Sequence, residues 1–175
     1  QKVIIQEIGM TADSPEDVVA DDFHRTAYPG QTLGACILGR TEVVDSLSRH
    51  AVERYVTTHY RPETMVISAS GAVSHAAFVD LVDRLFSELS SSSGPVTGYA
   101  PARYVGGDTR TTKDLEQAHV LVGFRGIPRS DPGYYNAVAL AHILGGGMSS
   151  RLFQEIREQR GLAYNIHAFH SAFQD

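Results

Sequence analysis

The chain has 175 residues, of which 42% are hydrophobic and 20% are charged, and its formal net charge is −5. This composition is typical of a globular protein with a core, and it contains no basic patch or membrane-length apolar run, so we expect neither nucleic-acid nor membrane partners. The single cysteine, Cys36, cannot form an internal disulfide, and no export signal is visible, which favours a bacterial cytoplasmic location.

Helices are predicted first in residues 1–27, with a break at Ser14-Pro15, because Ser14 can cap a helix and Pro15 suits its first position. Since the sequence opens with Gln1 inside an apolar stretch and stops without a terminating signal, we expect an internal piece of a longer protein. Further helices are predicted at 41–57 (two short helices capped by Thr41 and Ser48), 74–85 (capped by Ser74), 133–144 and 149–160 (capped by Ser149 and closed by Gly161).

Strands are predicted between these helices, at 65–70, 108–114, 118–125 and from 163 onward. Strands and helices do not alternate strictly, which favours an α+β fold with a mixed, largely antiparallel sheet packed against helices. The serine- and glycine-rich stretch 90–98 predicts a flexible connection and a domain boundary.

The eight histidines form none of the known zinc motifs of the H-E-x-x-H or H-x-x-E-H type. We therefore do not expect this chain to hold zinc with normal tetrahedral ligation by itself. The run Gly145–Gly147 precedes a predicted helix and permits either a phosphate loop or a tight turn, but the lysine that P-loops need is absent.

Arg157 lies beside the apolar stripe of the helix predicted at 149–160, which is formed by Leu152, Phe153 and Ile156. A half-sheltered guanidinium there is suited to binding a carbonyl or carboxylate. Tyr164 follows the turn at Gly161 and could return near Arg157. The alternative is a surface arginine and a core tyrosine.

Five ordered blocks of the sequence resemble the pitrilysin, insulinase and mitochondrial-processing-peptidase family of zinc metallopeptidases, the inverted zincins. The most specific block is LGGGMSSRLFQEIRE at 144–158 with GLAY at 161–164. The others are IQEI at 5–8, YPG at 28–30 with LG at 33–34, LGRTE at 38–42, and HYRPETM at 59–65 with the predicted strand that follows into Gly71.

The resemblance implies a zinc site made of two histidines of H-x-x-E-H and a downstream glutamate, with the motif glutamate as general base. Glu7 matches the third zinc ligand, and the histidines are expected upstream of this chain. Arg157 and Tyr164 match an arginine–tyrosine pair that holds the substrate backbone near the zinc. Gly145, Gly146 and Gly147 lie next to this pair and are expected to touch substrate.

The resemblance also implies an organisation and an activity. Residues 1–93 correspond to the end of a first, zinc-binding domain, 94–106 to a linker, and 107–175 to the start of a second, similar domain, as in one half of a clamshell. The parent is expected to be a zinc endopeptidase, with one zinc ion per catalytic unit, that hydrolyses unfolded peptides or presequences in a closed chamber. It is expected to work as a homodimer or with a sister subunit, and this chain alone is expected to be inactive.

Two other interpretations remain open. The parent could be a non-catalytic partner subunit of the same family that supplies substrate-binding residues to a catalytic sister chain. A third possibility is a generic α+β binding domain.

Overall fold

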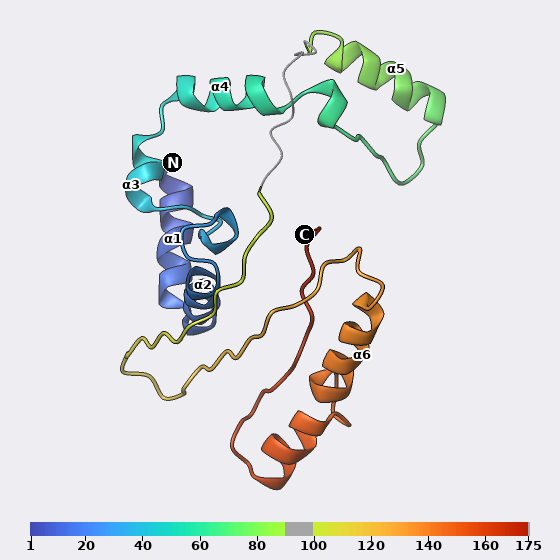
Figure 1. Ribbon diagram of the computed structural model, residues 1–175. Coiled ribbons are helices and arrows are strands. Elements are labelled where there is room, and N and C mark those ends of the chain that lie inside the picture. Colours follow the sequence, from blue (N-terminus) through green and yellow to red (C-terminus); the bar gives the residue numbers. More distant parts are fainter. Residues whose placement is uncertain (90–99, 175) are drawn as a thin grey trace. The chain divides into compact units, whose positions relative to one another are not determined.

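The computed structural model describes residues 1–89 and 100–174, and all the regular elements in these residues are helical (Figure 1). In chain order they are α1 (Lys2–Asp13), α2 (Pro15–Ala27), the 3₁₀ turn η1 (Thr32–Gly34), α3 (Thr41–Ser46), α4 (Arg49–His59), the 3₁₀ turn η2 (Pro62–Thr64), α5 (His75–Phe86), α6 (Tyr134–Gly145) and the π-helix η3 (Phe153–Gln159). The chain divides into two compact units, one made of residues 1–10 and 38–99 and the other of residues 11–37 and 100–175.

The first unit is tied together where its two segments meet. The Gln1 amide Nε2 donates hydrogen bonds to the carbonyl oxygens of Val44, Asp45 and Leu47, the last at 2.6 Å. Val44 is only 6% exposed and is the buried hydrophobic residue of this unit among the described residues. The start of α1 is therefore fastened to α3.

In the second unit α2 and η1 pack together, and the chain returns to them after residue 100. The Val105 N–H donates to the Ala27 carbonyl at 2.8 Å, and Ala27 is 2% exposed. The Arg103 N–H donates to Gln31 Oε1 at 2.7 Å, and Gln31 Nε2 donates to the Arg103 carbonyl at 2.8 Å. A side-chain amide thus takes the place of a backbone partner for that residue.

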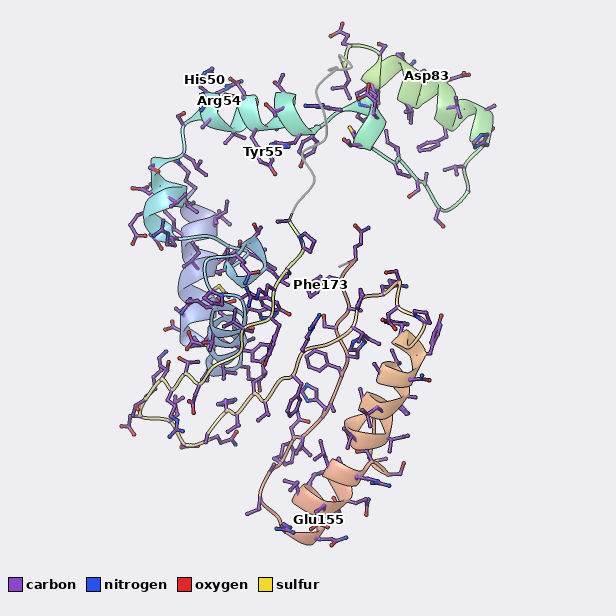
Figure 2. All side chains as sticks on the ribbon, in the orientation of Figure 1. His50, Arg54, Tyr55, Asp83, Glu155 and Phe173 are labelled. Carbon is purple, nitrogen blue, oxygen red and sulfur yellow. The ribbon has the colours of Figure 1, made fainter. Side chains whose placement is uncertain are left out.

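The second unit continues through an irregular segment to α6 and η3, and an extended segment then runs back beside them (Figure 1). The Ala168 N–H donates to the Gly145 carbonyl at 3.2 Å, at the end of α6. Further along, the Arg129 N–H donates to the Phe173 carbonyl at 2.9 Å, so segments about forty residues apart in sequence meet there. Phe173 is labelled in Figure 2.

The predicted α+β fold with its antiparallel sheet is wrong: no described residue belongs to a strand. The segments 65–70, 108–114, 118–125 and 163–174 do not join a ladder, and the backbone bonds of the last are isolated contacts such as that between Ala168 and Gly145. Alternation is nevertheless present, because Val120, Val122 and Phe124 are 74–84% exposed while the residues between them are half-buried. Such a pattern favours extended backbone but cannot supply the neighbouring strand that a sheet requires.

The helices agree with the sequence pattern better than the strands do, and their N-cap residues explain the agreement. Both Ser14 and Ser48 act as N-caps, with Oγ accepting from the N–H of Asp17 at 3.4 Å and of Ala51 at 3.2 Å. Ser74 precedes α5 as predicted, although its side chain makes no capping bond. The prediction for Thr41 is wrong by one residue, because Arg40 occupies the cap position of α3.

The predicted connection at 90–98 lies outside the described residues, and the domain ranges 1–93, 94–106 and 107–175 stay predictions. Among the described residues, no helix has the length and apolar character needed to cross a membrane.

Replacing Ser48 by Ala removes the capping acceptor of α4 and should lower the free energy of unfolding by about 1 kcal/mol. The matched control is Ser74→Ala, which removes a cap hydroxyl that makes no bond and should cost less. Urea unfolding followed by circular dichroism measures both. Equal losses in the two variants would contradict the role of the Ser48 bond.

Candidate functional site

The last helix of the second unit begins after a tight turn at 146–150. The Gln154 N–H donates to the Ser150 carbonyl at 3.0 Å, and the Gln154 amide Nε2 donates to the Met148 carbonyl at 2.7 Å. Ser150, not the predicted Ser149, therefore precedes the first helical residue, Arg151. Ser150 is 6% exposed, and its Oγ has no hydrogen-bond partner in the part of the chain that the structure describes.

Over η3 the helix is a π-helix, which is wider than an α-helix. Gly161 ends the helix, as the sequence predicts. Gly161 has φ +61°, a conformation that favours glycine. Its N–H donates to the Arg157 carbonyl at 3.1 Å, and the Leu162 N–H donates to the Ile156 carbonyl at 3.0 Å. These bonds turn the chain back toward the helix that it has just left.

This turn brings Tyr164 to Arg157. The guanidinium carbon of Arg157 lies 5.3 Å from the centre of the Tyr164 ring. It also lies 4.5 Å from the centre of the Phe153 ring, one turn earlier in the same helix. The arginine side chain is 34% exposed, so two aromatic rings shelter it while part of it stays open to solvent.

The hydrogen-bonding edge of Arg157 is little used. Within the described part of the chain, its nearest carboxylate oxygen belongs to Glu158, at 3.9 Å, and that side chain is 52% exposed. Arg160, directly after the same helix, differs, because its Nε and Nη2 both donate to Glu155, at 2.8 and 2.6 Å. Glu155 is labelled in Figure 2. A loose, exposed pair adds little energy, so Arg157 keeps donors for a further acceptor.

Tyr164 is 85% exposed, and no hydrogen bond of its hydroxyl is seen among the described residues. A phenol can donate to a carbonyl oxygen, and a guanidinium beside it can donate two parallel bonds. The pair thus presents donors suited to oxygen atoms of a peptide or a carboxylate.

The three glycines next to the pair differ in their surroundings. Gly145 is buried, and a side-chain carbon there would collide with the backbone N of Ala168. Gly146 is crowded by His142 of its own helix. Only Gly147 faces open space, so among the three it alone has room beside it for another molecule.

Glu7 lies in the middle of α1, is exposed, and belongs to the first unit. Across residues 1–89 and 100–174, no group of three or more His, Cys, Asp or Glu side chains is placed to hold a metal ion. A zinc site needs three or four protein ligands, so the described residues do not form one by themselves.

Sequence reasoning missed the part played by Phe153, which it assigned only to the apolar stripe of the helix. The spacing from Phe153 to Arg157 is i to i+4, and side chains at this spacing lie on the same helix face. That spacing was the available signal.

Comparison with known proteins assigns the chain to a family. The model of the peptidase M16 inactive domain matches residues 46–175. An uncharacterized zinc protease of Rickettsia felis is 38% identical over 99% of this chain and 42% of its own length, and the uncharacterized zinc protease YmxG of Bacillus subtilis is 34% identical over 100% of this chain and 42% of its own length. The chain belongs to the peptidase M16 family, which confirms the zinc-peptidase family identified from its motifs.

Solved structures share the fold at low sequence identity. The peptidase M16 inactive domain from Pseudomonas fluorescens has a TM-score of 0.71 and 16% identity, over 98% of this chain and 42% of that one. A chain of complex III2 from Candida albicans, with Inz-5 bound, has a TM-score of 0.72 and 22% identity, over 90% of this chain and 40% of that one. This chain thus spans well under half the length of the relatives that it matches.

Replacing Gly145 by Ala should destabilise the protein by about 1–3 kcal/mol, because the new methyl group meets the Ala168 backbone, which cannot swing away as a side chain can. Gly147→Ala is the matched control: its methyl group enters open space, and its change should stay within about 0.5 kcal/mol. Thermal and urea unfolding test both variants. A neutral Gly145→Ala variant would contradict the close packing of α6 on the 167–168 backbone.

Proposed function

We propose that this chain is part of a zinc endopeptidase that cleaves unfolded peptides, and that Arg157 and Tyr164 bind the substrate backbone. Membership of the peptidase M16 family supports the reaction class. The single observation that carries the role of the pair is the guanidinium of Arg157, held against the Tyr164 ring while its donors remain little used.

The chemistry of the two side chains fits a peptide carbonyl. The Arg157 guanidinium donates charge-assisted hydrogen bonds, and the Tyr164 hydroxyl donates another from a neighbouring position. Donors that are held in place before the substrate arrives orient the carbonyl at little entropic cost. As negative charge develops on the carbonyl oxygen during attack, these donors bind it more tightly than in the ground state, which lowers the barrier.

Glu7 is our candidate for a zinc ligand, on the match of the IQEI block alone. The other two ligands of this proposal are the histidines of an H-x-x-E-H motif, which the family resemblance implies upstream of this chain. The preference for presequences, the closed chamber and the pairing with a second copy or a sister subunit belong to the same proposal. They rest on the family resemblance.

A second candidate is a non-catalytic subunit that offers Arg157 and Tyr164 to a catalytic partner. The family model that matches three quarters of the chain describes an inactive domain, which favours this role for the segment 46–175. In both candidates the arginine–tyrosine pair binds peptide, and they differ in whether the same polypeptide also cleaves it.

Replacing Arg157 by Ala in the full-length protein should lower kcat/KM for an unfolded fluorogenic peptide by roughly 100-fold, the usual effect of removing a donor that stabilises a developing oxyanion. The matched control is Arg151→Ala, an exposed arginine on the same helix, for which we expect little change. Equal activity of the two variants contradicts the role of Arg157. If the unmodified protein binds peptide without cleaving it and Arg157→Ala abolishes the binding, the non-catalytic subunit is the correct assignment.

Replacing Glu7 by Gln in the full-length protein should weaken zinc binding by roughly 100-fold or more, because second-shell changes already cost 10- to 100-fold and a direct ligand contributes more. Zinc content after dialysis, measured by atomic absorption, reports the loss. Glu16→Gln is the matched control, since Glu16 is another exposed helical carboxylate. Full zinc retention in Glu7→Gln would rule out the ligand assignment.

A further inference from the structure

The Phe153 ring is the closest aromatic neighbour of the candidate binding arginine. The guanidinium carbon of Arg157 lies 4.5 Å from the centre of this ring, against 5.3 Å for Tyr164. Phe153 and Arg157 belong to the same helix, η3, and Phe153 is half-buried. The ring is therefore better anchored than that of Tyr164, which is 85% exposed.

Contact with a ring and contact with a carboxylate use different parts of a guanidinium. Aromatic rings attract its flat face, whereas hydrogen-bond acceptors bind its edge. In Arg160 the edge is occupied, because Glu155 accepts from two of its nitrogens. In Arg157 the rings act on the side chain while the nearest carboxylate, that of Glu158, stays at 3.9 Å. A ring thus restrains Arg157 without using the donors that a substrate needs.

Backbone contacts fix the geometry of this cluster. η3 is a π-helix, a rare form that recurs at functional sites. The carbonyl of Arg157 accepts from the Gly161 N–H, and the carbonyl of Ile156 accepts from the Leu162 N–H. The segment that carries Tyr164 is therefore tied to the same helical turn that carries Arg157, and Phe153 lies one turn before it.

We propose that Phe153 is a positioning residue for substrate binding: its ring holds the guanidinium of Arg157 so that the donors on its edge meet the peptide backbone. This inference rests on the proposed role of Arg157. A long arginine side chain loses much rotational freedom when it binds, and a ring that already restrains it removes part of that loss before the substrate arrives.

The test uses the full-length protein and the variants Phe153→Leu, Phe153→Tyr and Arg157→Ala, together with the double variant Phe153→Leu/Arg157→Ala. Binding of a fluorescein-labelled unfolded peptide of mixed sequence gives Kd by fluorescence anisotropy. The Nε–H resonance of Arg157 in ¹⁵N-arginine-labelled protein, assigned by its loss in Arg157→Ala, reports the ring contact directly.

Phe153→Leu should weaken peptide binding about two- to fivefold, the range expected for loss of one cation–π contact, and should move the Arg157 Nε–H resonance. Phe153→Tyr should restore both, because the ring returns. In the Arg157→Ala background Phe153→Leu should weaken binding no further, since the ring has no guanidinium left to hold. Phe169→Leu is the matched control, as it removes an exposed ring of the same unit that lies beside His167 instead of an arginine.

Other outcomes distinguish the positioning role of Phe153 from the proposed function of Arg157. If Arg157→Ala weakens binding but Phe153→Leu changes neither Kd nor the resonance, or costs the same with and without Arg157, the positioning role is overturned and the proposed function stands. If Arg157→Ala leaves Kd unchanged, the proposed function is overturned, and the role of Phe153 in it falls as well.

Discussion

Hydrogen bonds between groups far apart in the sequence join the segments of each unit. Few side chains are buried among residues 1–89 and 100–174. Ala27 and Val44 are the buried hydrophobic residues among those described, and both lie beside such a bond. Val44 accepts from the Gln1 amide, and Ala27 accepts from the Val105 N–H. These bonds show which distant segments meet within each unit.

The candidate site follows from one such set of ties. Gly161 adopts a positive φ, which lets the chain reverse and lets two backbone N–H groups reach carbonyls of η3. The reversal places one aromatic ring near Arg157 from beyond the turn, and the helix itself supplies another. The site thus depends on local geometry within about twelve residues, which explains why a single sequence block carries so much of the family resemblance.

The helices agree with the sequence pattern, whereas the predicted sheet is absent from the described residues, and the difference has a physical reason. A helix satisfies its backbone within a short segment, so caps such as Ser14 and Ser48 and the closing Gly161 mark its ends. The alternation in 118–125 is equally clear, but strand pairing depends on a distant partner that no local pattern specifies. The proximity of Arg157 and Tyr164 was predictable because the turn between them is short. The contact with Phe153 was missed because the i to i+4 spacing was interpreted as apolar packing alone.

The extended row of Val120, Val122 and Phe124 has a consequence for the behaviour of the chain in solution. These side chains are 74–84% exposed on a segment whose backbone has no ladder partner in the described structure. An unpaired extended segment with an apolar face tends to pair with the same segment of another molecule. The net charge of −5 opposes such contacts by mutual repulsion, and salt screens that repulsion. Raising the ionic strength should therefore favour self-association of this chain.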